Sequence, residues 1–262
     1  MKQRINDIEI AYSDTGRGQK VVMLHGLAED RHSFADVQTR LRRVHTFACD
    51  LRGHGDTDLG NADGTLAQLG NDLGDFLEAV TGPAACVGYS LGGTIVLWAA
   101  AMRPELVLHA VVAGTSVKVG YTANGFFRER IKLVENDKFA FAQALYRDTA
   151  AQLVSKGIDV EKLARKRLQS IHGGAGYINA AQAMMGLHDE PLTPLLEKIR
   201  CPVDVIGADQ DLFCPRKAAH MITEALTDVA YHEIADAGHL MSVDQPVVYS
   251  DTLQKILDRR II

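Results

Sequence analysis

The stretch AACVGYSLGGTIVLWAAA, residues 84–101, sets one serine, Ser90, among glycines, between a short apolar run and a longer one. The run before Ser90 is typical of a buried strand, and the run after it is typical of a helix. A sharp strand-to-helix turn strains the backbone of the residue at its tip, so it requires small neighbours such as Gly88 and Gly92. The following helix would point its N-terminus at the serine hydroxyl. The alternative is a glycine-rich turn that only permits close packing.

Short apolar runs of the same kind recur along the chain and alternate with longer segments of helical spacing. The predicted strands lie at 8–12, 21–24, 45–49, 84–87, 110–113, 203–207 and 229–234. We expect 8–12, where apolar and polar residues alternate, to be a half-exposed edge strand. The predicted helices lie at 33–42, 65–80, 91–102, 215–227 and 246–259. This alternation indicates an α/β fold with a mainly parallel sheet and helices on both of its faces.

Residues 117–198 break this alternation, because they contain helical patterns and no convincing strand. We therefore expect a core domain formed by residues 1–116 and 199–262, with 117–198 inserted as a helical cap. An insertion at this point would lie over the carboxyl ends of the strands, which is the edge where open α/β sheets bind ligands.

The bulk composition narrows the class of protein. The chain has 262 residues, enough for one large domain or one domain with an insertion. A formal net charge of −5 disfavours a general nucleic-acid or anionic-membrane binder, since both require clustered basic charge. The most basic stretch, ARKRLQS at 164–170, is short and predicts one solvated helix face. We expect no nucleic-acid and no membrane partner, and a monomer or a homodimer.

Four cysteines, Cys49, Cys86, Cys201 and Cys214, show no spacing typical of a metal site. They predict free, largely buried thiols in a reducing compartment. No 18-residue apolar span of the kind that crosses a membrane occurs in the sequence, and the N-terminus lacks the apolar core of a signal peptide. We expect a cytoplasmic protein with no metal and no organic cofactor.

A serine hydroxyl is a weak nucleophile and needs a base. His239, in AGHL, follows the last predicted strand on a loop that would return to the carboxyl edge beside Ser90. His25, in HGLAED, is the rival, although its place before Gly26 suits the positioning of the backbone better. We therefore favour His239 as the base.

The base in turn needs an acid that fixes its tautomer. Asp211 and Asp209 both follow the predicted strand at 203–207, and we favour Asp211 because the turn after it opens the next helix. The developing oxyanion needs donors, for which the backbone N–H groups of Leu27 and Leu91 are the candidates.

Five motifs in this order resemble those of the α/β-hydrolase superfamily. They are HG at 25–26, DLRGHGDT at 50–57, GYSLGG at 88–93, GADQDLFCP at 207–215 and AGHL at 237–240. The resemblance implies an eight-stranded, mostly parallel sheet with one antiparallel strand near its start, and a helical cap at 117–198. The organisation is similar to that of small esterases and 3-oxoadipate enol-lactone hydrolases. A serine nucleophile argues against the epoxide hydrolase and haloalkane dehalogenase branches.

The cap and the loops below it predict a largely apolar pocket. Its candidate lining residues are His25, Tyr89, Phe126, Phe127, Arg128, Met184, Met185 and His188. For most of these the alternative is that they pack the cap onto the core. Arg128, Arg130 and His188 are candidates to bind a substrate carboxylate.

We expect a serine hydrolase of a small carboxylic ester or lactone that forms an acyl-enzyme on Ser90. The alternatives are a carbon–carbon bond hydrolase, a perhydrolase or a thioesterase on the same fold. A ligand-sensing or partner-binding protein that retains the fold is the alternative from another class.

Overall fold

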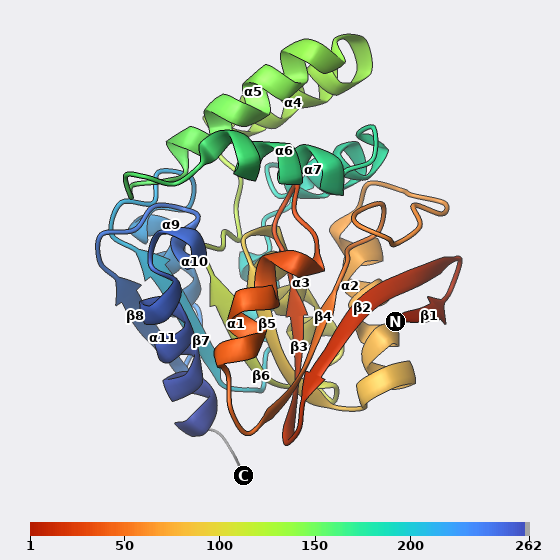
Figure 1. Ribbon diagram of the computed structural model, residues 1–262. Coiled ribbons are helices and arrows are strands. Elements are labelled where there is room, and N and C mark those ends of the chain that lie inside the picture. The colour runs from red at the N-terminus through yellow and green to blue at the C-terminus, as the bar shows by residue number, and fades with distance from the viewer. Residues whose placement is uncertain (260–262) are drawn as a thin grey trace.

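The computed structural model describes residues 1–259, and an eight-stranded sheet forms its centre (Figure 1). The strand order is β1-β2-β4-β3-β5-β6-β7-β8. The strands are β1 (Lys2–Ile5), β2 (Ile8–Gly16), β3 (Gln19–Leu24), β4 (Val44–Cys49), β5 (Ala84–Tyr89), β6 (Val107–Ala113), β7 (Val203–Ala208) and β8 (Val229–Ile234). Among the described strands, β2 alone runs antiparallel to its neighbours, β1 and β4, and the other pairs are parallel. The predicted fold class is therefore confirmed.

The prediction that 8–12 forms an edge strand is wrong. It belongs to β2, whose outer side is covered by β1, with Ile5 opposite Ile8 and Gln3 opposite Ile10. The sequence does not reveal β1, because its four residues, KQRI, carry almost no apolar pattern. The edges of the sheet are thus β1 and β8.

Helices cover both faces of the sheet, as predicted. The core helices are η1 (Arg31–Phe34), α1 (Ala35–Arg40), α2 (Leu66–Phe76), η2 (Leu77–Thr81), α3 (Leu91–Met102), α8 (Thr193–Leu196), α9 (Arg216–Thr223), α10 (Met241–Asp244) and α11 (Pro246–Arg259). Alternate residues of each strand face opposite sides, so β3 gives Val21 and Met23 to one buried cluster and Val22 and Leu24 to the other. Helices α1 and α11 complete the first cluster, and α2, α3, α8 and α9 complete the second.

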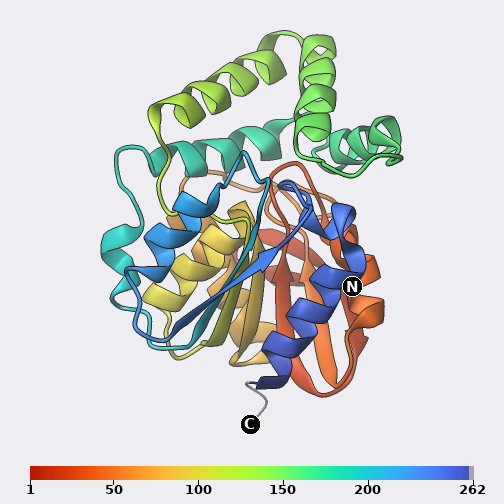
Figure 2. The ribbon, with the colours of Figure 1, turned by 90° about the vertical axis from the view of Figure 1, so that its left-hand side faces the viewer.

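Four further helices lie between β6 and β7 in the chain and across the carboxyl ends of the parallel strands (Figures 1 and 2). They are α4 (Tyr121–Asn136), α5 (Lys138–Ala151), α6 (Val160–Ser170) and α7 (Ala175–Gly186). They enclose a small apolar cluster of their own, which includes Phe141, Ile171 and Tyr177 and reaches down to Ala28 of the core. We call α4–α7 and their connections the cap.

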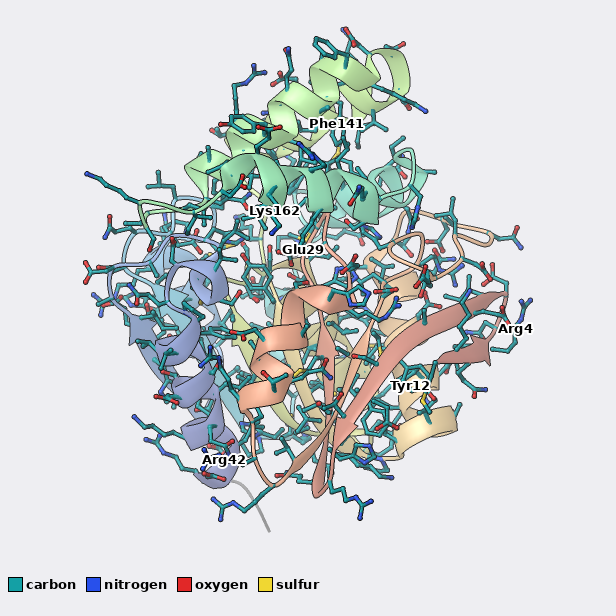
Figure 3. The ribbon with its side chains drawn as sticks, viewed as in Figure 1. Arg4, Tyr12, Glu29, Arg42, Phe141 and Lys162 are labelled. Atoms are coloured by element: carbon teal, nitrogen blue, oxygen red, sulfur yellow. The ribbon has the colours of Figure 1, made fainter. Side chains whose placement is uncertain are left out.

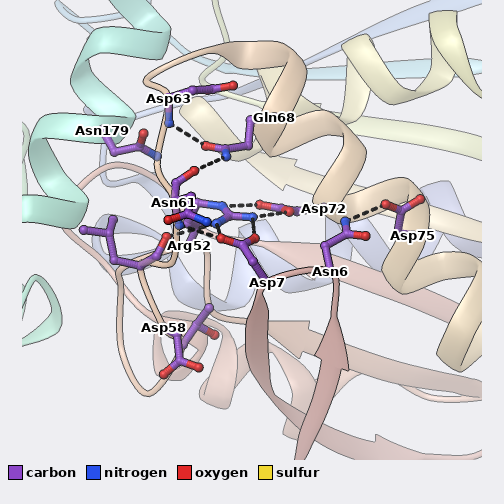
Figure 4. A network of polar contacts seen from close by, with 12 residues as sticks. Asn6, Asp7, Arg52, Asp58, Asn61, Asp63, Gln68, Asp72, Asp75 and Asn179 are labelled. Carbon is purple, nitrogen blue, oxygen red and sulfur yellow. Dashed lines mark hydrogen bonds and ion pairs between the residues drawn. The ribbon is translucent and has the colours of Figure 1, made fainter.

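A buried arginine fixes the loop that follows β4 (Figure 4). The Arg52 guanidinium donates two hydrogen bonds of 2.8 Å to the Asp72 carboxylate of α2 and others to Asp7 in the turn between β1 and β2. Its hydrogen bonds lower the pKa of Asp7 to about 2. Farther along, the Gly64 N–H donates to Asn179 Oδ1 of α7 at 2.8 Å. The network therefore joins the first strands, α2 and the cap.

The four cysteines are free, with Cys49 and Cys86 buried in the sheet and Cys201 and Cys214 partly exposed. Among residues 1–259, none of the helices has the length and apolar character needed to cross a membrane.

Candidate active site

Ser90 lies at the tip of the turn between β5 and α3 with φ +53° and ψ −117°, a strained conformation for a residue with a side chain. Its N–H donates to the Ala113 carbonyl of β6 at 2.8 Å. A Cβ atom on Gly88 would collide with the Gly92 carbonyl, and one on Gly92 would collide with the Leu24 carbonyl of β3. The two glycines therefore permit the turn that exposes the serine, which is the steric role the sequence predicts for them.

A chain of hydrogen bonds runs from Ser90 into the interior. The Ser90 Oγ lies 3.1 Å from His239 Nε2, and His239 Nδ1 lies 2.8 Å from Asp211 Oδ2. Because a carboxylate only accepts hydrogen bonds, Nδ1 carries the proton and Nε2 is left free to accept from the serine hydroxyl. The arrangement is able to withdraw a proton from Ser90 and stabilise the resulting imidazolium.

The Asp211 side chain is fully buried, which on its own would disfavour its charge. The positive charge and hydrogen bond of His239 outweigh that cost, and the N–H groups of Phe213 and Cys214 each donate to Asp211 Oδ1 at 2.8 Å. The pKa of Asp211 is consequently below its usual value, so the carboxylate stays ionised beside the imidazole.

Asp209, the other candidate acid, lies in the same loop but accepts from the Ala237 N–H at 3.2 Å. It supports the loop that carries His239, while Asp211 contacts the imidazole itself.

The two candidate oxyanion donors come from the helix that follows Ser90 and from the loop after the neighbouring strand β3. The Leu91 N–H belongs to the first residue of α3, and Leu27 lies in the loop after β3. Within residues 1–259, neither N–H donates a hydrogen bond to another protein group. Both therefore remain candidates for the oxyanion donors.

Two of the predicted pocket residues support the loops around the site. His25 is fully buried, its Nδ1–H donates to the Gly26 carbonyl at 2.8 Å, and its Nε2 accepts from the Leu51 N–H at 3.0 Å. The Tyr89 hydroxyl donates to the His239 carbonyl at 2.6 Å. The ring nitrogens of His25 are both engaged, so that side chain offers nothing to a substrate.

Aromatic rings reach from the cap to the imidazole. The Phe213 ring lies 5.5 Å from His239, Phe126 of α4 lies 6.2 Å from Phe213, and Phe127 lies 5.6 Å from Phe126. Sequence reasoning named Phe126 and Phe127 but missed Phe213. Its place two residues after Asp211 is a signal that would have pointed to it.

The remaining predicted pocket residues are more dispersed. Arg128 is exposed, Met184 is buried in the core cluster and Met185 is half-buried. His188 donates from Nδ1 to the Val119 carbonyl at 3.0 Å. Among residues 1–259, no hydrogen bond or ring contact joins these four side chains to Ser90 or His239.

Arg130, the other cation proposed for a substrate carboxylate, is already paired. It donates to both oxygens of Asp148 at 2.7 and 2.8 Å, and its guanidinium lies 4.5 Å from the centre of the Phe126 ring.

One prediction about the basic stretch is wrong at Arg167. It lies in ARKRLQS, the stretch expected to be a solvated helix face, yet it is only 7% exposed. Four of the other residues of that stretch, Arg165, Lys166, Leu168 and Gln169, are exposed as expected. The sequence does not show which basic residue is buried, because a run of charged residues on a helix has the same pattern whichever of them faces the core. Glu29, which sequence reasoning also missed, lies below α6 at the top of the sheet (Figure 3).

The family model of the alpha/beta hydrolase fold matches residues 20–246. The pimeloyl-[acyl-carrier protein] methyl ester esterase of Chromobacterium violaceum is 30% identical over 233 residues, which cover 86% of this chain and 88% of that protein.

The 2-hydroxy-6-oxo-6-(2'-aminophenyl)hexa-2,4-dienoic acid hydrolase of Metapseudomonas resinovorans is 22% identical over 97% of this chain and 89% of its own length. The crystal structure of the enol-lactonase from Burkholderia xenovorans superposes with a TM-score of 0.88 at 20% identity, covering 98% of this chain and all of that one. At that identity the superposition shows a common fold.

Proposed function

Because this chain belongs to the alpha/beta hydrolase fold family, we propose that it is a serine hydrolase of a small carboxylic ester or lactone. The observation that carries the proposal is the hydrogen-bond chain from Ser90 through His239 to Asp211, at 3.1 and 2.8 Å. Nucleophile, base and orienting acid lie within the distances that proton transfer requires. The esterase and the enol-lactonase among the similar proteins support the same reaction class.

In the proposed mechanism His239 Nε2 removes the Ser90 proton as Oγ attacks the carbonyl carbon of the substrate. The negative charge that develops on the carbonyl oxygen is stabilised by the N–H groups of Leu27 and Leu91. His239 then returns the proton to the leaving alkoxide, and an ester to Ser90 remains. A water molecule, deprotonated by the same nitrogen, attacks that ester and releases the acid.

The cap segment, 117–198, covers this site in the proposal. Phe126 of α4 packs against Phe213, and Phe213 packs against His239, so the space beside the imidazole has an aromatic wall. Arg130 and Arg167 already donate to protein groups. An apolar acyl group therefore suits the site better than one that carries a second carboxylate.

A panel of substrates tests the reaction and its preference together. We expect turnover of p-nitrophenyl esters of increasing chain length and of neutral lactones, with weaker activity on an enol-lactone carboxylate or on a dienoic acid such as the relative from Metapseudomonas hydrolyses. Acid-quenched digests should contain the acyl group on the peptide that holds Ser90. Preferred cleavage of the dienoic acid would contradict the ester assignment. A single stoichiometric burst without steady turnover would favour a sensor.

A further inference from the structure

Two loops of the core present the proposed catalytic groups, and the cap contacts both. We call residues 25–30, after β3, the oxyanion loop, and residues 235–240, after β8, the histidine loop. Arg167 of α6 donates from Nη2 to the Leu27 carbonyl at 3.2 Å and from Nε to the Ala28 carbonyl at 3.4 Å. A buried cation of the cap therefore holds the backbone of the oxyanion loop.

Hydrogen bonds also connect the same guanidinium, through Gln152, to the histidine loop. Arg167 Nη1 donates to Gln152 Oε1 at 2.9 Å and to Thr149 Oγ1 at 3.0 Å. The backbone carbonyl of Gln152 accepts from the Leu240 N–H at 3.0 Å, one residue after His239. A continuous polar path thus runs from the oxyanion loop through Arg167 and Gln152 to the histidine loop.

The cap backbone next to Gln152 adds a second link. The Asp244 carboxylate accepts from the Gly238 N–H at 2.8 Å and from the Ser155 N–H at 2.9 Å. The residue before His239 and the cap backbone therefore share one anchoring carboxylate.

The oxyanion loop needs such support because its backbone is strained. Ala28 has φ +57°, a conformation that residues with a Cβ rarely adopt and that persists only when its surroundings impose it. On one side of Leu27 the Gly26 N–H donates to Glu29 Oε2 at 3.0 Å. On the other side are the two carbonyls that accept from Arg167, so the peptide group that offers the Leu27 N–H is held from both ends.

We propose that Arg167 and Gln152 form a staple that joins the oxyanion loop to the histidine loop, so that docking of the cap sets the spacing between the Leu27 N–H and His239. Both are positioning residues, since neither contacts the reacting atoms. The inference rests on the proposed function and extends it. The cap, in this account, completes the oxyanion site as well as enclosing the substrate.

The test replaces each end of the staple and measures kcat, KM and inhibition by a trifluoromethyl ketone, whose hemiketal adduct on Ser90 needs the oxyanion donors. Arg167→Met and Gln152→Met should lower kcat by about 100-fold, the size of effect seen when an oxyanion donor is lost. KM should change less than threefold, and the inhibition constant should rise in parallel with the loss of kcat. Gln152→Glu keeps an acceptor for Arg167 and should restore much of the rate.

Arg165→Met is the matched control, because Arg165 lies on the same helix, is exposed and, within the described part of the chain, pairs with Glu161 alone, at 2.7 Å. Active-site titration with a fluorophosphonate normalises the rates to folded enzyme. If Arg167→Met does not fold, the same kinetic measurements on Arg167→Lys and Gln152→Met test the proposal. If the wild-type enzyme is active and the folded staple variants show an unchanged kcat or a rise in KM alone, the proposed role of Arg167 and Gln152 is wrong. Wild-type protein that turns over no ester contradicts the proposed function instead.

Discussion

His239 depends on Asp211 for its tautomer, and Asp211 depends on its loop for its charge. The carboxylate is fully buried, yet the imidazole and two backbone N–H groups keep its pKa low. One oxygen is occupied by the N–H groups of Phe213 and Cys214, and the other accepts from His239. The orientation of the proposed base, His239, therefore follows from the fold of one short turn after β7.

The first prediction concerns this pair. Asp211→Asn should lower kcat by roughly 10⁴, because an amide stabilises the wrong tautomer of His239 and leaves the imidazolium without a counter-charge. Asp209→Asn is the matched control in the same loop and should keep kcat within about threefold, since the Asp209 side chain accepts, among residues 1–259, from the backbone N–H of Ala237 and not from His239. Steady-state kinetics of the two variants decide. Equal losses in both would mean that Asp211 acts through the loop and not through His239.

A second prediction concerns Phe213, which stands between Phe126 and His239. Phe213→Ala should remove the wall beside the imidazole and shift the preference from acetate toward longer acyl esters. Each methylene accommodated is worth about 1–3 kcal/mol, or at least roughly tenfold in the ratio of kcat/KM values. Leu212→Ala is the control, because that side chain is 82% exposed. A uniform loss on every ester would show that Phe213 supports His239 without selecting the acyl chain.

At the scale of elements, the sequence predicts most of the sheet and its helices. Seven strands are apolar or alternating runs, and each falls within an observed strand. Strand β1 is not predicted from the sequence, because KQRI pairs through its backbone and buries little side-chain surface. Sequence reasoning also brings Ser90, His239 and Asp211 to one edge, because residues that follow parallel strands meet there.

The rest of the site depends on contacts between distant segments. The inward turn of Arg167 is set by how α6 docks on the oxyanion loop, about 140 residues earlier in the chain. The ring of Phe213 is placed by Phe126 of the cap. Neither contact leaves a local pattern, since an arginine among exposed charges and a phenylalanine in a turn are both common.

The turn at Ser90 gives the third prediction. Gly88→Ala should lower the free energy of unfolding by at least about 2 kcal/mol, because the added methyl group meets the Gly92 carbonyl and the backbone of Gly93. At Gly125, within α4, an added Cβ atom has no described heavy atom within 4 Å. Gly125→Ala should therefore raise the free energy of unfolding by about 0.5–1 kcal/mol. Urea unfolding of both variants measures the difference. A Gly88→Ala protein as stable as wild type would contradict the close packing of β5 and α3.

At the scale of the whole molecule, the proposed site lies where two layers meet. The sheet supplies Ser90, Asp211 and His239 at its carboxyl edge, and the cap packs its own apolar cluster onto the oxyanion loop at Ala28. The cap also reaches the loops of the core through Asn179, Arg167 and Gln152. Cap and core are thus joined by polar contacts at several separate points.

Burial of two histidines predicts an acid-sensitive fold. Burial lowers the pKa of His25 to about 4 and that of His54 to about 3. Between these values and the usual 6.5, the unfolded chain binds protons that the native state does not, so stability falls as pH falls. From pH 6.5 to pH 5 the loss is about 2 kcal/mol for each histidine.

His54→Asn should retain a donor toward the Arg52 carbonyl and flatten the slope by one histidine's share. Urea unfolding at pH 7 and pH 5 measures it. A variant with the same slope as wild type would show that His54 titrates normally in the native state.

In the proposed function, Ser90 forms an acyl-enzyme that turns over. The most direct test compares steady-state hydrolysis of p-nitrophenyl acetate by wild-type protein and by Ser90→Ala protein whose melting temperature shows that it is folded. We expect steady turnover by wild type and a loss of at least about 10³-fold in the variant, since residual catalysis then comes only from binding and the oxyanion donors. Hydrolysis by folded Ser90→Ala protein within tenfold of the wild-type rate would contradict it.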